Sequence, residues 1–137
     1  MNHLKTTAAK LGLELGTRKM TYNSRLAQEV GLWAETKGRG HQFHMEAFKA
    51  YFVDGKNIAK KEVLFDLVKK SKLDLKEAEA IIDERTFSNA VDSDWERSKK
   101  VGITAVPTFL IGLDRLVGAQ PYETLKKVIE KYSTASV

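Results

Sequence analysis

The feature that most constrains the fold of this chain is the run from Gly102 to Gly112, which reads GITAVPTFLIG. It places Pro107 directly before an apolar strand candidate, Thr108–Ile111. Proline has no backbone N–H to donate to a sheet, so it occurs at the first residue of a strand, on an edge strand or at a special turn. The cis form of an X-Pro bond costs only about 0.5–1 kcal/mol. We therefore expect Pro107 to open a strand, with Val106–Pro107 as a candidate cis peptide bond.

The composition is that of an ordinary globular protein without cysteine. Of the 137 residues, 42% are hydrophobic and 30% are charged, which predicts one domain, residues 1–137, with a buried core. The absence of cysteine excludes disulfides, thiol redox chemistry and thiolate metal ligands within this chain. No apolar run approaches the roughly 20 residues that span a bilayer, and the first residues, MNHLK, hold no apolar leader segment. We expect a cytoplasmic protein without membrane contact.

The net charge of +5 raises the question of nucleic-acid binding. A nucleic-acid-binding protein concentrates its positive charge in one stripe or tail. Here the lysine pairs are spread over successive predicted helices and alternate with Glu and Asp. The pairs are Lys60-Lys61, Lys69-Lys70, Lys99-Lys100 and Lys126-Lys127. We expect them to form a solvated surface and predict no nucleic-acid partner.

Helical periodicity dominates the chain from Tyr22 to about Gly102, where apolar residues recur every three or four positions. Asp74, followed three residues later by Glu77, is typical of a capped helix start. The predicted helices begin near Tyr22, His41, Lys60, Asp74 and Asn89, and the second continues to Asp54.

After Gly102 the apolar period changes from 3.6 to 2. Thr108–Ile111 and Arg115–Val117 predict a β-hairpin around the turn 112–114, and Tyr122–Tyr132 predicts a final helix. Near the N-terminus, Leu11, Leu13 and Leu15 alternate as a short strand would.

Four stretches of this sequence carry a family resemblance. They are Tyr22-Asn23-Ser24, AFKAYF at 47–52, the loop Ile103–Phe109 and VGAQPY at 117–122. Together they resemble the DsbA-like branch of thioredoxin-fold proteins, specifically the FrnE-type predicted dithiol–disulfide isomerases. The resemblance runs from about Leu11 to Tyr132. It implies a helix-rich α/β fold of truncated thioredoxin-like (DsbA) type, with a helical insertion at 22–102 and a C-terminal ββα half at 103–132.

In the resembling family a strand, a Cys-x-x-Cys helix and a second strand precede the part that matches this chain. Without that unit the predicted sheet is a two-stranded ribbon, which is marginal alone in water. Thr108–Ile111 would expose an unpaired apolar edge. We expect a second copy of the chain to cover it in a homodimer. Two alternatives stay open: Leu11–Leu15 supplies a substitute strand, or the natural protein is longer.

The resemblance also points to a binding site at Val106, Pro107 and Thr108. In the family, the residue before the cis-proline offers its backbone N–H and C=O to an extended substrate peptide. The competing interpretation is that Pro107 only shapes the start of a strand. We predict substrate binding at these three residues and no catalytic residue, because the cysteine pair is absent.

The remaining candidates have structural explanations. His41 and His44 share a helix face but lack a third ligand, so we predict a surface pair and no metal. Six aromatic residues fall on helical faces, where core packing is favoured over an aromatic-lined pocket. They are Trp33, Phe43, Phe48, Tyr51, Phe52 and Trp95.

The predicted function is therefore that of a DsbA/FrnE-like thiol–disulfide oxidoreductase family member that is itself redox-inactive and needs no cofactor. Thiol–disulfide exchange requires a thiolate, which this chain cannot supply. Two alternatives remain. One is a non-catalytic module that binds a peptide or protein. The other is a glutathione-dependent protein similar to kappa-class transferases or 2-hydroxychromene-2-carboxylate isomerases.

Overall fold

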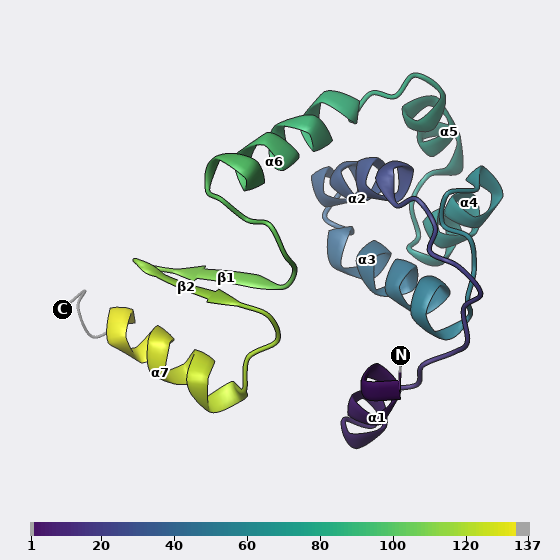
Figure 1. The fold of residues 1–137 in the computed structure, drawn as a ribbon. Helices are drawn as coiled ribbons and strands as arrows, with labels where there is room; N and C mark the ends of the chain where they lie inside the picture. The colour runs from purple at the N-terminus through teal and green to yellow at the C-terminus, as the bar shows by residue number, and fades with distance from the viewer. Residues whose placement is uncertain (1, 134–137) are drawn as a thin grey trace. The chain divides into compact units, whose positions relative to one another are not determined.

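The computed structural model describes residues 2–133 and is rich in helix, with one small antiparallel sheet. Figure 1 shows the succession of helices, the hairpin and the last helix along the chain. The helices are α1 (Asn2–Lys10), α2 (Arg25–Thr36), α3 (Gly40–Phe48), a π-helical turn η1 (Lys49–Val53), α4 (Lys61–Lys70), α5 (Leu75–Asp83), α6 (Ser88–Lys100) and α7 (Tyr122–Ser133); the strands are β1 (Thr108–Ile111) and β2 (Asp114–Val117).

The chain divides into two compact units, residues 1–93 and 94–137. The division falls inside α6. The sequence places the change from the helical part to the ββα part a little later, between residues 102 and 103. The single-domain organisation with subdomains 22–102 and 103–132 stays a prediction.

The first unit is built around one hydrophobic core. Its centre is α2, which packs against α3 and α5, while α4 packs against α3 and α5. Helix α2 supplies Val30, Trp33 and Ala34, which are fully or almost fully buried. Helical spacing places these residues on one stripe, and that stripe loses contact with water. The rest of the cluster is Ala27, Phe43, Ala50, Ile58, Leu64, Leu67, Val68, Ala78 and Ile82.

The start of α5 is capped as the sequence predicts. Asp74 has an extended backbone conformation, and its carboxylate accepts a hydrogen bond of 2.7 Å from the backbone N–H of Glu77. This bond satisfies one of the N–H groups that a helix leaves unpaired at its first turn.

The strand considered at Leu11–Leu15 is not formed. Instead α1 ends at Lys10, and residues 13–17 have no regular secondary structure. Gly12 has a left-handed backbone (φ +68°), and the N–H of Leu13 donates to the carbonyl of Ala8 at 2.9 Å. This is a glycine-terminated helix end, so the N–H of Leu13 is already used and is not free for a strand ladder.

The second predicted helix is also interrupted. Regular α3 ends at Phe48, and the π-turn η1 continues it with wider hydrogen bonds, such as the one from the N–H of Asp54 to the carbonyl of Lys49 at 3.0 Å. The carbonyl of Phe52 accepts from the N–H of Gly16 at 2.8 Å. Single π-turns of this kind interrupt α-helices.

The second unit contains the hairpin and α7. Thr108 pairs with Val117 and Ile111 with Asp114 in an antiparallel register. Strand β1 has the predicted range, and β2 begins one residue earlier than predicted. Helix α7 packs against β1, and the hydroxyl of Tyr132 accepts a hydrogen bond of 3.0 Å from the N–H of Leu113.

Candidate functional site

The loop that leads into β1 holds the three residues predicted to bind a substrate. The Val106–Pro107 peptide bond is cis. The carbonyl of Pro107 accepts from the N–H of Gly118 at 2.7 Å, and the hydroxyl of Thr108 donates to the carbonyl of Ala105 at 2.6 Å. Val106 is 89% exposed. The loop is therefore anchored at Pro107 and Thr108, while the side chain of Val106 is open to solvent.

The sheet leaves one edge of β1 open within the described residues. On its other edge, β1 pairs with β2. On β2, Arg115 donates to the carbonyls of Val101 and Gly102, the latter at 2.7 Å, and so ties the hairpin to the end of α6. Backbone N–H and C=O groups on such an edge are a template for another strand.

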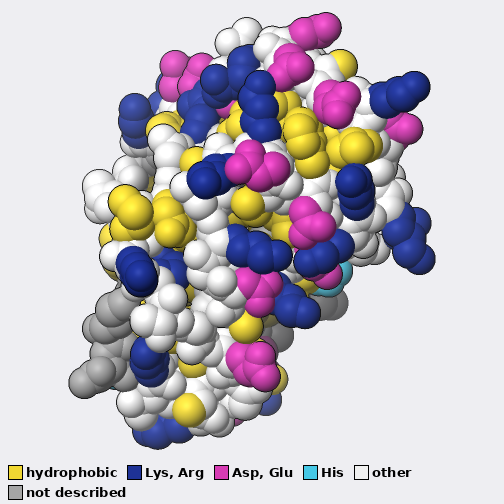
Figure 2. Space-filling model, turned by 90° about the vertical axis from the view of Figure 1, so that its right-hand side faces the viewer, with side chains coloured by type: hydrophobic (Ala, Val, Ile, Leu, Met, Phe, Trp, Pro, Cys, Tyr) yellow, Lys and Arg dark blue, Asp and Glu magenta, His cyan; other side chains and the backbone are white. Residues whose placement is uncertain are grey.

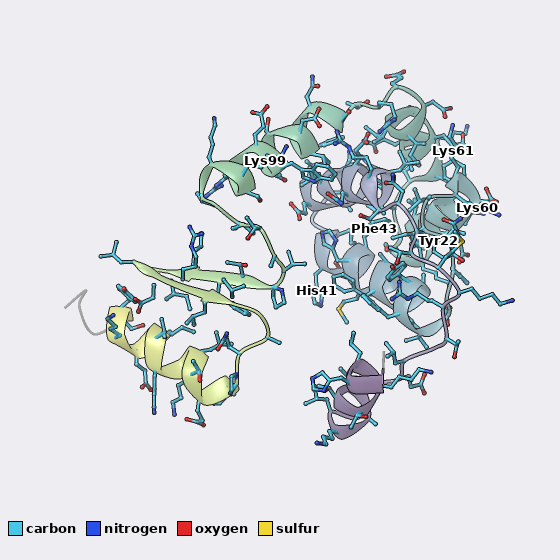
Figure 3. The ribbon with its side chains drawn as sticks, viewed as in Figure 1. Tyr22, His41, Phe43, Lys60, Lys61 and Lys99 are labelled. Carbon is cyan, nitrogen blue, oxygen red and sulfur yellow. The ribbon has the colours of Figure 1, made fainter. Side chains whose placement is uncertain are left out.

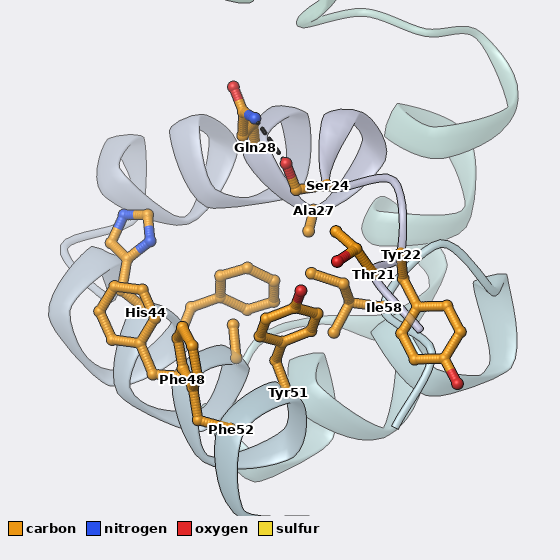
Figure 4. A pocket seen from close by; sticks show the side chains of 12 residues that line it. Thr21, Tyr22, Ser24, Ala27, Gln28, His44, Phe48, Tyr51, Phe52 and Ile58 are labelled. Carbon is orange, nitrogen blue, oxygen red and sulfur yellow. Dashed lines mark hydrogen bonds between the residues drawn. The ribbon is translucent and has the colours of Figure 1, made fainter. Parts of the chain in front are cut away.

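A second candidate site is a cavity of about 320 Å³ in the first unit. Figure 4 shows α2, which carries Ala27 and Gln28, on one side of it, and α3 with η1, which carry Phe48 and Tyr51, on the other. Ser24, the residue directly before α2, also lines it. Its remaining lining residues are Thr21, Tyr22, Phe43, His44, Ala47, Phe52 and Ile58. The volume lies at the lower end of the range for small-ligand pockets.

Three polar side chains of the cavity lining take part in hydrogen bonds: Gln28, Ser24 and His44. The Gln28 amide donates to the Ser24 hydroxyl at 2.9 Å, as the dashed line in Figure 4 shows. His44 Nε2 lies 3.2 Å from Glu35 Oε1. Tyr51 packs edge-to-face against Tyr22 with ring centroids 6.4 Å apart. The cavity can enclose an apolar group, and it presents no thiol nucleophile because the chain has no cysteine.

The core-packing prediction is wrong for three of the six aromatic residues. Phe48, Phe52 and Trp95 are exposed, whereas Trp33 and Phe43 are buried. Phe48 and Phe52 belong to the interrupted stretch at the end of α3 and in η1, where they line the cavity. The pocket alternative therefore describes these two residues better than the core alternative.

The lysine pairs are exposed, as the sequence predicts, and so is His41, whereas His44 is half-buried and lines the 320 Å³ cavity. His41 is in the first turn of α3 (Figure 3). Among residues 2–133, no group of three or more His, Asp or Glu side chains is placed to hold a metal ion. Figure 2 shows Lys and Arg mixed with Asp and Glu over the face in view. In the described part of the chain, no helix combines the length and apolarity that crossing a membrane requires.

Sequence reasoning missed a buried carboxylate in the first unit. Glu29 is 1% exposed. It receives hydrogen bonds from Arg85, at 2.9 Å for Nε to Oε1, and from Arg25 Nε at 3.3 Å. Arg25 also pairs with Asp92 at 2.8 Å. The hydrogen bonds and charge of Arg85 lower the pKa of Glu29, although burial acts in the opposite direction.

This network joins α2 to the end of α5 and the start of α6. Arg85 has a left-handed backbone (φ +52°) at the position after α5 where glycine is usual. The one sequence signal for Glu29 was its position on the apolar face of α2, three residues after Leu26. The network holds α2, α5 and the start of α6 together within the first unit.

Comparisons with known proteins agree with this fold. The family model of the DSBA-like thioredoxin domain matches residues 1–130. The uncharacterized protein YwbO of Bacillus subtilis (strain 168) is 27% identical over 129 residues, which are 92% of this chain and 64% of that protein. The crystal structure of a probable DsbA oxidoreductase from Streptomyces coelicolor matches with a TM-score of 0.87 at 24% identity, covering 95% of this chain and 57% of that one.

The chain thus spans less than two thirds of the length of these two relatives. At 24% identity the structural match establishes a shared fold. The family model covers nearly the whole chain. We conclude that this protein belongs to the DSBA-like thioredoxin domain family.

Proposed function

We propose that this chain is a redox-inactive member of its family that works by strand pairing at the open edge of β1. The observation that carries the proposal is the combination of a chain without cysteine and a β1 edge that begins at the exposed Val106. Thiol–disulfide exchange proceeds by attack of a thiolate on a disulfide sulfur. This chain has no thiolate to attack with, so it retains binding without the chemistry.

We further assign the chain to the FrnE-type group within the family and to the cytoplasm. The FrnE assignment rests on Tyr22-Asn23-Ser24, the AFKAYF stretch at 47–52 and VGAQPY at 117–122. A chain without disulfides suits a reducing compartment, which supports the cytoplasmic assignment.

The redox part of the proposal is tested by an insulin-reduction assay with dithiothreitol. The purified chain should leave the rate of insulin precipitation equal to that of the reaction without protein. A DsbA-family protein with an intact cysteine pair serves as the positive control. Turnover by this chain above the protein-free reaction would refute redox inactivity.

The first partner that we propose for the β1 edge is a second copy of the chain. Thr108–Ile111 is apolar and belongs to a two-stranded sheet, and Leu110 on this strand is 45% exposed. Pairing with an identical edge would extend the sheet and remove this strand from water. An extended peptide docking at Val106, Pro107 and Thr108 would use the same backbone groups and would compete with the dimer.

A lysine on β1 tests both partners, because a charge on an edge strand opposes strand addition. We expect Leu110→Lys to convert a dimer to a monomer in light scattering. It should also weaken binding of a fluorescent, reduced and carboxymethylated lactalbumin, which supplies extended chain without free thiols. The matched control is Leu113→Lys, which adds the same charge at a 95% exposed position in the hairpin turn.

The two readouts separate the partners. A dimer that Leu110→Lys dissociates and Leu113→Lys does not supports pairing between copies. A monomeric wild-type chain that binds the unfolded lactalbumin through the same position supports peptide binding alone. A monomer that binds no unfolded polypeptide, or equal effects of both lysines, would overturn the proposal for the β1 edge.

A further inference from the structure

Arg18 carries a charge without a carboxylate partner in the described part of the chain. Its guanidinium carbon lies 4.1 Å from the ring centroid of Tyr51 and 5.5 Å from that of Phe52. Its Nη1 atom is enclosed and makes no hydrogen bond to any described residue. An enclosed polar donor without a partner is unfavourable, because it has lost water without gaining a hydrogen bond. The side chain is therefore held in place by aromatic contacts while part of its hydrogen-bonding capacity stays unused.

The backbone around Arg18 is fixed against η1. The N–H of Gly16 donates to the carbonyl of Phe52 at 2.8 Å. A Cβ atom at Gly16 would lie 1.9 Å from the carbonyl oxygen of Val53, so only glycine permits this approach. The π-turn that accepts the bond also supplies the two rings against Arg18. Such turns occur frequently at functional sites.

Arg18 lines a cavity of about 240 Å³. Arg18 and Lys5 are the two cationic residues in its lining, which contains no acidic residue. The other lining residues are Leu4, Lys5, Leu15, Gly16 and Phe52. A larger cavity of about 530 Å³ shares Leu4, Leu15 and Phe52 with it. The other apolar side chains of the larger cavity are Ala8, Leu11, Leu13, Met45, Phe48 and Val53, and its charged ones are Glu14 and Lys49.

We propose that these two adjoining cavities form a binding site for a straight-chain fatty acid anion. The carboxylate would lie in the smaller cavity at Arg18, with Lys5 as a second cation, and the alkyl chain would lie in the larger apolar cavity. A guanidinium donates charge-assisted hydrogen bonds to a carboxylate. Because Nη1 of Arg18 is enclosed, the other guanidinium nitrogens would make this contact. Each buried methylene of the chain adds favourable transfer from water. The cationic cavity adjoins the apolar cavity, just as the carboxylate of a fatty acid adjoins its alkyl chain.

This site is separate from the β1 edge and does not depend on the proposed function. All its residues belong to the first unit, and none of them is Val106, Pro107 or Thr108. The smaller cavity is lined by two cations, Lys5 and Arg18, whereas the larger cavity is lined by one acidic and one basic residue, Glu14 and Lys49. The excess of positive charge in the smaller cavity favours placing the carboxylate there.

The test is titration calorimetry of the full chain with decanoate, below the concentration at which it forms micelles. Decanoate should bind, and Arg18→Gln should weaken it by about tenfold to a hundredfold, which is the expected effect of losing a charge-assisted hydrogen bond. Lys19→Gln is the matched control, because it removes the neighbouring cation, which lines neither cavity. Leu4→Gln should also weaken binding, through the alkyl chain. Far-UV circular dichroism verifies that each variant is folded.

A neutral ligand of the same length, 1-decanol, separates the head from the tail. The wild type should bind 1-decanol more weakly than it binds decanoate. The wild type and Arg18→Gln should bind 1-decanol with equal affinity. The proposal is overturned if decanoate does not bind, or if Arg18→Gln and Lys19→Gln bind it equally. The proposal would also be overturned if a second copy of the chain covers the two cavities. In that case decanoate would fail to bind, and Leu4→Gln would lower the mass measured by light scattering.

Discussion

Residues 2–93 enclose a core of buried side chains, whereas no residue between 94 and 133 is buried. Both regions have amphipathic elements. Helix α2 has the apolar face Val30, Trp33 and Ala34, and α7 has Leu125, Val128 and Ile129. The first face is buried, but the residues of the second are exposed or half-buried.

The difference lies in the number of layers that each apolar face meets. In the first unit, α2 packs against both α3 and α5, and α4 packs against the same two helices. In the second unit, α7 packs against β1 of a two-stranded ribbon, and one such layer cannot enclose a helix face. An apolar pattern therefore specifies the type of element, while its burial depends on how many other elements cover it.

The largest effect on stability should come from a large-to-small substitution in the first unit. Leu64 is fully buried in α4. Leu64→Ala should lower the free energy of unfolding by about 2–5 kcal/mol, because it removes buried apolar atoms and leaves a cavity. Urea unfolding followed by the fluorescence of Trp33, in a Trp95→Phe background, measures this unit. A loss below about 1 kcal/mol would mean that this region is not closely packed and would remove the contrast between the units.

The next largest effect should come from Glu29. Glu29→Gln keeps the shape but turns an amide N–H₂ toward the guanidiniums of Arg25 and Arg85, and we expect a loss of about 1–3 kcal/mol. The same urea experiment at pH 7 measures it. Asp66→Gln is a control, because it removes an exposed carboxylate that pairs with Lys70 in the same unit.

Glu29 also predicts a dependence on pH. Its pKa in the folded protein is below the ordinary value of 4.5, chiefly because of Arg85. The stabilisation from this group is therefore complete above the unfolded-state pKa and is lost as the pH falls through the folded-state pKa. The difference in unfolding free energy between wild type and Glu29→Gln should shrink as the pH is lowered from 6 toward 3. A difference that is constant over this range would contradict the assignment.

A smaller effect is expected at the start of α5. Asp74→Ala removes the acceptor for the Glu77 N–H and should cost about 1 kcal/mol. Asp74→Ser keeps a capping oxygen and should recover most of the loss. Thermal unfolding by circular dichroism compares the three proteins, and equal midpoints for the alanine and serine variants would contradict the cap.

Features set by neighbouring residues were predictable from the sequence. The strand Thr108–Ile111 and the cap at Asp74 depend on a few adjacent side chains, and both appear where the sequence places them. The membership of the DsbA-like family follows from short stretches as well. Local chemistry is sufficient for such features because the hydrogen bonds and apolar periods that define them close within one turn or one strand.

Features that depend on distant partners were not predictable. The π-turn at 49–53 receives a hydrogen bond from Gly16, and the exposure of Phe48 and Phe52 follows from what covers them in space. The burial of Glu29 needs Arg85, which lies 56 positions away in the chain. The cavity beside Arg18 likewise joins α1 to η1. A single sequence gives no signal for such pairings, so the sites that they form come from the structure.

The smallest effect should come from Leu110 on β1, the counterpart of Leu64 in the second unit. Both are leucines in regular elements, but Leu110 is 45% exposed, so truncation removes fewer contacts and leaves no enclosed cavity. Leu110→Ala should change the free energy of unfolding by less than about 1 kcal/mol in the monomer. The measurement is urea unfolding followed by far-UV circular dichroism at protein concentrations where light scattering shows a single copy. A loss as large as that of Leu64→Ala would mean that β1 is covered in solution by something beyond β2 and α7. In that case the difference in burial between the two units would hold only for a single copy of the chain. Strand pairing at the β1 edge would then contribute to stability as well as to binding.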